Sequence, residues 1–405
     1  MKISLPKNIA SIIAIINNNG YKAHIVGGCV RDILINKIPT DWDITTNASP
    51  AVIKSLFPKT IDTGIKHGTV TVLQDNIPVE VTTWRKETSY SDHRHPDSIC
   101  LADSLEDDLS RRDFTMNAIA YHPLEGPVDP FNGFSDIKNR IIRCVGNPSE
   151  RFSEDALRML RAIRFSAQLD FDIDNFTFTA IKELSGYIIH ISKERIQGEI
   201  NKILEAKSPQ KLSLLWDSDL SKIIFPQIRS VPDIWYDLIK HFIGSVNQKE
   251  ILLSLLFYLA CKPDPASCAE EYLTGNKYDN KTQRIIKNHI NCLNGIGPLT
   301  RRNVRKAASE YGTSVTMNTL KILKIIRPID NNKPVFLNHI YSDAIPVIPA
   351  ISGNDLKSLG LAGRAIKDML DILQMCLYEN PDLNGNEILI QIAKSILTTS
   401  RLSGK

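Results

Sequence analysis

The pattern of apolar and polar residues changes about a third of the way along the chain. Short apolar runs alternate with polar turns at first, whereas later segments repeat apolar residues at helical spacing. Residues 23–26 are apolar and partly β-branched and are followed at once by glycines, so they predict a strand turning into a helix that ends near Leu34. Residues 41–45 and 77–84 alternate in character and predict two further strands, the second lying beside residues 69–73.

From Ser153 onward the periodicity is helical. Ser153 is a favourable N-cap residue, so a helix is predicted to begin there and to continue past Phe165. Later apolar stretches fit buried helix faces at residues 181–184, 196–204 and 251–259. Breaks rich in proline, asparagine or serine predict segment boundaries near residues 208–209, 262–265 and 331–334. The pattern therefore predicts an α+β domain followed by a helical remainder.

The turn at Gly27-Gly28 is the first candidate for chemistry. Glycine allows a backbone to approach a ligand closely, and the unpaired N–H groups at a helix start favour an anion. Arg31 lies on the first turn of the predicted helix and offers a planar set of donors that suits phosphate oxygens. Taken alone, this stretch is explained equally well as a tight turn with an ordinary surface arginine.

Asp41 and Asp43 follow this turn closely and favour the phosphate interpretation. Two residues apart in a strand, they are expected to point to one face while Trp42 and Ile44 enter the core. Crowded carboxylates repel unless a cation lies between them, and Mg²⁺ is the expected ion because it prefers carboxylates with phosphate oxygens and water. An isolated Asp-x-Asp usually marks solvated acids or a turn. Glu80, on a later predicted strand, is either a third metal-site acid or a solvent-facing residue.

Several stretches, taken in order, resemble the motifs of the class II tRNA nucleotidyltransferase and bacterial poly(A) polymerase family. The matching stretches are GGCVRD at 27–32 with DWDITT at 41–46, RRDFTMNA at 111–118, DPFNG at 129–133 with IRCVG at 142–146, RFSEDALRMLR at 151–161, and SKERI at 192–196. Residues 351–361 are also similar to bacterial CCA-adding enzymes, less specifically. The matches cover roughly the first half of the chain.

The resemblance implies Mg²⁺-dependent addition of C, C and A to the 3′ end of tRNA, from CTP and ATP, without a nucleic-acid template and with release of pyrophosphate. It assigns catalysis to Asp41 and Asp43, which hold the metal. Glu80 is added to the predicted catalytic residues because its strand is expected to lie beside that of Asp41. The resemblance assigns nucleotide binding to Gly27, Gly28, Arg31, Arg112, Asp113, Asp155, Arg158, Arg161 and Arg164. Within that set Asp113 is expected at the ribose hydroxyl, and helical phase places Arg164 nearly opposite Asp155.

Asp155 and Arg158 can be argued from base chemistry. Cytosine and adenine both present an exocyclic amine beside a ring-nitrogen acceptor, which an ionised Asp and an Arg match. Uracil and guanine present the opposite pattern and would leave buried groups unpaired, at about 1–3 kcal/mol each. The plainer interpretation is a local ion pair on a helix surface.

The resemblance also implies a domain order. It predicts a nucleotidyltransferase head of the DNA polymerase β type at residues 1–140, a neck that selects the nucleobase at 141–208, a body at 209–332 and a tail that grips tRNA at 333–405. Residues 86–97 are predicted to form a loop associated with the switch to adding A, which argues against a CC-only enzyme. A poly(A) polymerase or an A-only enzyme is the nearest alternative, and an RNA-binding protein with a decayed nucleotide site is the alternative from another class.

Composition fits a cytoplasmic protein with two or more domains. The chain has 405 residues and a formal net charge of +4, which permits RNA binding without requiring it. Residues 301–306 (RRNVRK) are a candidate RNA contact or a solvated helix face. No secretory signal or membrane span is expected, and no protein partner is implied. The 7 cysteines are scattered, odd in number and without a Cys-x-x-Cys pair, so they are predicted to be free thiols. A zinc set of Cys261, Cys268, His289 and Cys292 is the alternative, but its spacing is irregular.

Overall fold

The structure is a computed structural model that describes residues 3–65, 68–75, 77–87, 99–326 and 340–402. The chain divides into two compact units, Met1–Ser230 and Val231–Lys405, and each is described by itself. The predicted loop at residues 86–97 lies almost wholly outside the described residues, as does the predicted break at residues 331–334.

Unit 1 contains a mixed sheet of seven strands. In chain order these strands are β1 (Ala23–Val26), β2 (Asp43–Thr46), β3 (Thr60–Gly64), β4 (Thr69–Gln74), β5 (Ile77–Thr83), β8 (Ala120–His122) and β9 (Gly126–Val128). Their order across the sheet is β3-β4-β5-β2-β1-β8-β9. All neighbours are antiparallel except β2 and β5, which run parallel at the centre. The predicted strands at residues 23–26, 69–73 and 77–84 are confirmed within a residue.

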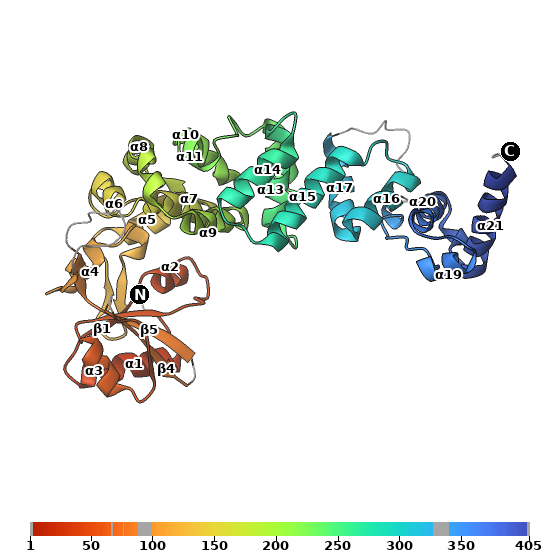
Figure 1. The fold of residues 1–405 in the computed structure, drawn as a ribbon. Helices are drawn as coiled ribbons and strands as arrows, with labels where there is room; N and C mark the ends of the chain where they lie inside the picture. Colours follow the sequence, from red (N-terminus) through yellow and green to blue (C-terminus); the bar gives the residue numbers. More distant parts are fainter. Residues whose placement is uncertain (1–2, 66–67, 76, 88–98, 327–339, 403–405) are drawn as a thin grey trace. The chain divides into compact units, whose positions relative to one another are not determined.

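Helices cover both sides of this sheet. They are α1 (Lys7–Asn18), α2 (Gly28–Leu34) and α3 (Pro50–Leu56). In Figure 1, α1 and α3 lie on the opposite side of β1 and β5 from α2, and α1 and α3 contact each other. Helix α1 turns its isoleucines at positions 9, 12, 13 and 16 into the core, where each is at most 2 % exposed. Helix α2 begins directly after β1 and ends at Leu34, as predicted.

The rest of unit 1 is mainly helical. Its elements are β6 (Arg85–Glu87), β7 (Ile99–Leu101), α4 (Leu105–Ser110), η2 (Thr115–Asn117), α5 (Gly133–Asn139), β10 (Ile141–Ile142), α6 (Pro148–Glu154), α7 (Leu157–Leu169), β11 (Asp172–Ile173), α8 (Asn175–Glu183), η3 (Ser185–His190), α9 (Lys193–Leu204), η4 (Pro209–Ser213), α10 (Leu214–Asp217) and α11 (Ser221–Ile224). Helices α7 and α9 pack against each other, and η4 contacts both.

The prediction of one helix beginning at Ser153 is wrong, because two helices meet there. Helix α6 is capped by Asn147, whose side chain accepts from the Ser149 N–H, and Ser153 donates its hydroxyl to the Ser149 carbonyl inside that helix. Asp155 is extended, with φ −141°, and its carboxylate accepts a hydrogen bond from the Leu157 N–H at 3.0 Å. The chain therefore breaks at Asp155 and starts again as α7.

Unit 2 is helical throughout its described residues. Its elements are α12 (Asp233–Ile239), α13 (Gln248–Ala260), α14 (Pro265–Gly275), α15 (Asn280–Gly295), α16 (Arg301–Tyr311), α17 (Thr313–Ile326), α19 (Gly353–Ser358), α20 (Arg364–Glu379), η5 (Pro381–Leu383) and α21 (Asn386–Leu402). The apolar run at residues 251–259 lies in the buried α13, and the break at residues 262–265 separates α13 from α14. An α+β domain followed by helices is confirmed.

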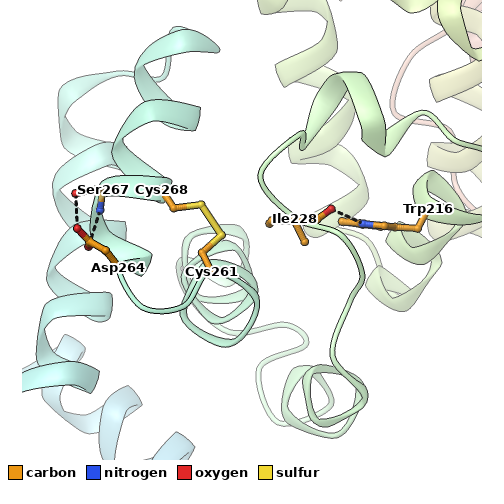
Figure 2. Close-up of a disulfide and its surroundings, with 6 residues drawn as sticks. All are labelled: Trp216, Ile228, Cys261, Asp264, Ser267 and Cys268. Atoms are coloured by element: carbon orange, nitrogen blue, oxygen red, sulfur yellow. Dashed lines mark hydrogen bonds between the residues drawn. A yellow bond between two sulfur atoms is a disulfide. The ribbon is translucent and has the colours of Figure 1, made fainter.

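The prediction that all cysteines are free is wrong for one pair. Cys261 and Cys268 form a disulfide between the end of α13 and the start of α14, with Cα atoms 6.4 Å apart (Figure 2). This pairing removes two ligands from the zinc set considered above. The other five cysteines are free. Among the described residues, no helix combines the length and apolar character that crossing a membrane requires.

Candidate functional site

Asp43 and Glu80 lie side by side at the centre of the sheet. They are direct partners in the parallel register of β2 and β5, so their side chains leave the same face. Burial raises the pKa of Asp43, and the nearby carboxylates of Glu80 and Asp41 raise it too, while Arg112 acts in the opposite direction. Glu80 is exposed. The structure thus brings together the three acids that the sequence singled out.

Asp41 reaches this group from outside the strand. Strand β2 begins only at Asp43, so the expectation that both aspartates alternate along one strand is wrong. Asp41 lies in the preceding bend, is exposed, and accepts a hydrogen bond from the Thr40 hydroxyl at 3.3 Å. Ile44 is fully buried, but Trp42 is only half-buried.

These acids have the donor chemistry that a hard divalent cation requires. All three offer carboxylate oxygens, and Asp43 is held among like charges that a cation would offset. In the described part of the chain, no three Asp, Glu, His or Cys side chains already converge tightly enough to form a complete metal-binding group. Mg²⁺ ordinarily takes one or two carboxylates and fills its remaining positions with phosphate oxygens and water, so the donors present fit such an ion.

The glycine turn lies directly against Asp43. Gly27 has φ +80°, and a Cβ placed there would be 3.1 Å from Arg112 Nη1 and 3.9 Å from Asp43 Oδ2. A side chain at this position would therefore be strained and would also crowd both charged groups. Gly28 begins α2, where a Cβ would meet only Arg31 Nη2 at 3.6 Å.

Arg31 is hydrogen-bonded to the matching stretch at residues 111–118. Its Nη2 pairs with Asp32 Oδ1 at 2.8 Å, and its Nη1 donates to Asn117 Oδ1 at 2.8 Å. Asn117 in turn donates to Asp113 Oδ1 at 3.2 Å. Asn117 was missed as a site residue, although it lies inside the matching stretch RRDFTMNA. Asn117 thus hydrogen-bonds both charged groups, Arg31 and Asp113, and fixes their orientation.

Asp113 is a buried carboxylate held by Arg161. Burial would raise its pKa, but the charge and hydrogen bonds of Arg161, with the bond from Asn117, outweigh that effect and lower the pKa to about 2. Arg161 Nε donates to Asp113 Oδ2 at 2.8 Å. Both carboxylate oxygens therefore already accept hydrogen bonds from the protein.

Asp108, which the sequence analysis missed, organises the neighbouring arginines. It is fully buried, accepts from the Thr45 hydroxyl at 3.0 Å, and pairs with Arg111 Nε at 3.1 Å and Arg112 Nη2 at 3.4 Å. It is one of three consecutive acids in α4, and no local pattern distinguishes it from Glu106 or Asp107. Its burial beneath β2 is a tertiary property.

Three of the predicted nucleotide-binding arginines gather on one aromatic ring. The guanidinium carbons of Arg164, Arg31 and Arg161 lie 4.1, 5.2 and 5.6 Å from the ring centroid of Phe165. Such contacts orient a guanidinium over the ring face. Arg164 Nε also lies 2.7 Å from Glu199 Oε2, so its charge is compensated within the protein.

Arg31, Asp41 and Arg164 line one cavity of about 500 Å³. The prediction that Arg164 lies nearly opposite Asp155 assumes that both residues belong to one helix. Because the chain breaks at Asp155, the phase of α7 does not extend to it. The structure directs Arg164 toward Arg31 and Asp41.

Asp155 and Arg158 lie within one turn of each other but bond to different partners. Asp155 pairs with Arg195 through Oδ2–Nη2 at 2.9 Å and Oδ1–Nη1 at 3.4 Å. Arg158 Nη1 donates to Glu154 Oε2 at 2.6 Å, and its Nη2 donates to the Arg111 carbonyl at 3.2 Å. The local pair expected between Asp155 and Arg158 is replaced by these contacts. Arg195 was missed, although it lies in the matching stretch SKERI.

The basic run at residues 301–306 is largely committed to structure. Arg305 is only 8 % exposed, pairs with Asp343 at 2.7 Å and donates to the Tyr378 and Glu379 carbonyls at 3.0 Å. Arg302 pairs with Glu379 at 3.1 Å. Arg302 and Arg305 therefore join α16 to α20, so the run is not a wholly solvated face, and an RNA contact at its exposed residues stays a prediction.

Comparisons with known proteins show the family to which the chain belongs. The poly A polymerase head domain matches residues 23–143, and the probable RNA- and SrmB-binding site of polymerase A matches residues 170–231. A CCA-adding enzyme of Geobacillus sp. (strain WCH70) is 36 % identical over 385 residues, which is 93 % of each chain. The chain belongs to the family of CCA-adding enzymes.

Two further CCA-adding enzymes are similar to this chain. That of Enterococcus faecalis is 50 % identical over 198 residues, covering 49 % of each chain. The crystal structure of the Bacillus stearothermophilus CCA-adding enzyme, solved in complex with CTP, covers 98 % of each chain with a TM-score of 0.77 and 28 % identity. As a member of this family the chain is a nucleotidyltransferase, and its mixed sheet belongs to the nucleotidyltransferase head.

Proposed function

We propose that this protein adds C, C and A to the 3′ end of tRNA, using CTP and ATP and releasing pyrophosphate, with no nucleic-acid template. The observation that carries the proposal is that Asp43 lies against the glycine turn and is close enough to Glu80 and Asp41 for their charges to raise its pKa. A triphosphate held at the turn would meet the end of an RNA strand beside these acids. The relatives named as CCA-adding enzymes support the same assignment.

The acids are proposed to hold Mg²⁺. Asp41 and Asp43 are its ligands and Glu80 is the third catalytic carboxylate, because Glu80 is the direct strand partner of Asp43. A bound Mg²⁺ would lower the pKa of the attacking 3′ hydroxyl and neutralise charge on the triphosphate. Gly27, Gly28 and Arg31 receive the phosphates, and Arg112, held by Asp108 beside Gly27, adds a second guanidinium there.

Asp155 and Arg158 are proposed to select the base. The bidentate contact with Arg195 fixes the plane of the Asp155 carboxylate, so that it accepts from the amine of cytosine or adenine. Arg158 donates to the ring nitrogen. Uracil and guanine would set a carbonyl against the Asp155 carboxylate and a ring N–H against the Arg158 guanidinium, which leaves buried polar groups unpaired.

Asp113 and Arg161 are proposed to help position the nucleotide. Since both oxygens of Asp113 already accept hydrogen bonds, we favour a role in orienting Arg161 and Asn117 over direct contact with the ribose. Arg164 lines the cavity shared with Arg31, with its guanidinium paired to Glu199. The division into head (1–140), neck (141–208), body (209–332) and tRNA-binding tail (333–405) remains a prediction.

A poly(A) polymerase or an A-only enzyme is the second candidate, favoured by the match of residues 23–143 to a poly A polymerase head. One experiment separates them. A tRNA lacking its last three nucleotides is incubated with Mg²⁺, CTP and ATP, and the product ends are sequenced. Addition of CCA is expected. A run of adenosines, or addition of A only after CC is already present, would assign the alternative.

A further inference from the structure

The cavity beside Asp41 holds more positive charge than the proposed nucleotide contacts explain. Besides Arg31 and Arg164, three lysines line it, and the proposed function gives them no role. Lys37 follows α2, Lys202 is in the last turn of α9, and Lys207 lies in the segment before η4. Five cationic side chains face three acidic ones, which are Asp32, Asp41 and Glu205. Arg31 is paired with Asp32 and Arg164 with Glu199, so the excess positive charge comes from the three lysines, which face only Asp41 and Glu205. The lining therefore favours an anion.

Lys202 is connected to the buried charges of the site. The carboxylate of Glu199 is 7 % exposed and lies 2.7 Å from Arg164 Nε and 3.8 Å from Lys202 Nζ. The side chain of Lys202 nevertheless stays 51 % exposed. Glu199 thus holds this ammonium on the same side as Arg164 while leaving it open to a ligand.

The proposed reaction requires two polyanions to meet at the same carboxylates. One is the triphosphate, which the glycine turn and the arginines receive. The other is the RNA strand, whose 3′ hydroxyl must come next to Asp41. Phosphodiester contacts position a strand without reading its sequence, and lysine supplies a mobile point charge that accepts varied geometry. A strand end of variable sequence needs contacts of this kind.

We infer that Lys37, Lys202 and Lys207 bind the phosphodiester backbone of the RNA strand that is being extended. This assignment rests on the proposed function and adds the site at which the strand end is held. All three lysines are exposed, so their substitution leaves the core intact.

The test compares Lys202→Ala/Lys207→Ala with Lys138→Ala/Lys182→Ala, a control that removes the same charge from exposed lysines of unit 1 outside this cavity. For the full-length proteins, KM for a tRNA lacking its 3′ end and KM for CTP are measured between 50 and 200 mM salt. Filter binding gives Kd for the same RNA without nucleotide.

We expect the cavity variant to raise KM and Kd for the RNA about tenfold, with KM for CTP unchanged. The slope of log Kd against log salt should fall by about 0.7 for each phosphate of a single strand that the variant no longer neutralises. A rise in KM for CTP alone would assign the lysines to the triphosphate and overturn the inference. Equal effects in the control variant, or no effect in either, would overturn it too. If the wild type adds no nucleotide, the proposed function fails, and the filter-binding comparison still decides the RNA site.

Discussion

Asp43 and Glu80 are direct partners on the parallel strands β2 and β5, and their proximity helps to raise the pKa of Asp43. Two like charges at the centre of a sheet oppose folding, so an arrangement of this kind is typical of a site that binds a cation or another positive group. The two acids are 37 residues apart in the chain, and the pairing of β2 with β5 brings them together.

Replacing Asp43 by Asn should abolish nucleotide transfer without unfolding the protein. Loss of a metal ligand is expected to reduce kcat by about a thousandfold or more. Because burial and two neighbouring carboxylates disfavour the charge, the neutral amide should leave the midpoint of thermal unfolding unchanged or raise it. Pyrophosphate release and a thermal melt test both parts.

Glu80→Gln serves as the matched comparison and should lose about ten- to a hundredfold in kcat. Activity equal to the wild type in Glu80→Gln would make Glu80 an ordinary solvent-facing residue. Full turnover by Asp43→Asn would reject the metal assignment altogether.

Arg195 is expected to control base choice through Asp155. Arg195→Ala removes the bidentate contact that orients the Asp155 carboxylate. We expect kcat/KM for CTP to fall about tenfold, which corresponds to about 1.4 kcal/mol, and the preference for CTP over UTP to narrow. Steady-state kinetics with both nucleotides provide the measurement.

Lys193→Ala, an exposed change at the start of the same helix, is the control and should behave as the wild type. A variant of Arg195 that loses activity equally with CTP and UTP, at unchanged ratio, would show that Arg195 does not act on base selection.

Gly133 is expected to tolerate no side chain. A Cβ there would overlap the Thr115 carbonyl oxygen and lie 2.8 Å from Ile119 Cγ1, both buried parts of the stretch that carries Asp113 and Asn117. Gly133→Ala should therefore displace this stretch, lowering the free energy of unfolding by about 1–3 kcal/mol and reducing activity as well.

Gly186→Ala provides the comparison, since a Cβ at Gly186 meets nothing within 4 Å. Denaturant unfolding of both variants decides the matter. Equal stability in the two variants would show that the backbone around Thr115 moves freely, contrary to this packing argument.

His24 should make unfolding depend on pH between 7 and 5. Burial, followed by the neighbouring His122, lowers the pKa of His24 to about 4, against about 6.5 when unfolded. The unfolded chain then binds more protons in this range, so the stability due to neutral His24 is present above pH 6.5 and is lost as pH falls toward 4.

The expected loss between pH 7 and pH 5 is about 2 kcal/mol. Denaturant titrations at the two pH values measure it, and His24→Phe should abolish most of the difference. His241→Gln, at an exposed position, should retain it. A pH dependence that His24→Phe leaves untouched would place its origin elsewhere.

Local signals in the sequence determined the elements that begin the site. A β-branched run followed by glycines predicts a strand that turns into a helix. The structure has β1 and α2 at these positions. Asp43 and the motif stretches could be predicted as site residues because their residue types and spacing match metal and phosphate binding. The prediction of a helix start at Ser153 is wrong because Asn147 and Pro148 supply an earlier start signal and the extended Asp155 ends that helix.

What the sequence determined by itself was the order of elements, the chemical nature of the acids and arginines, and the family to which they point, since these depend on neighbours along the chain. Only the tertiary structure decided which charges meet. The pairing of Asp155 with Arg195, the burial of Asp108 and the gathering of arginines around Phe165 join segments far apart in sequence. Such contacts are selected by packing and by the need to compensate buried charge, and no local pattern records that selection.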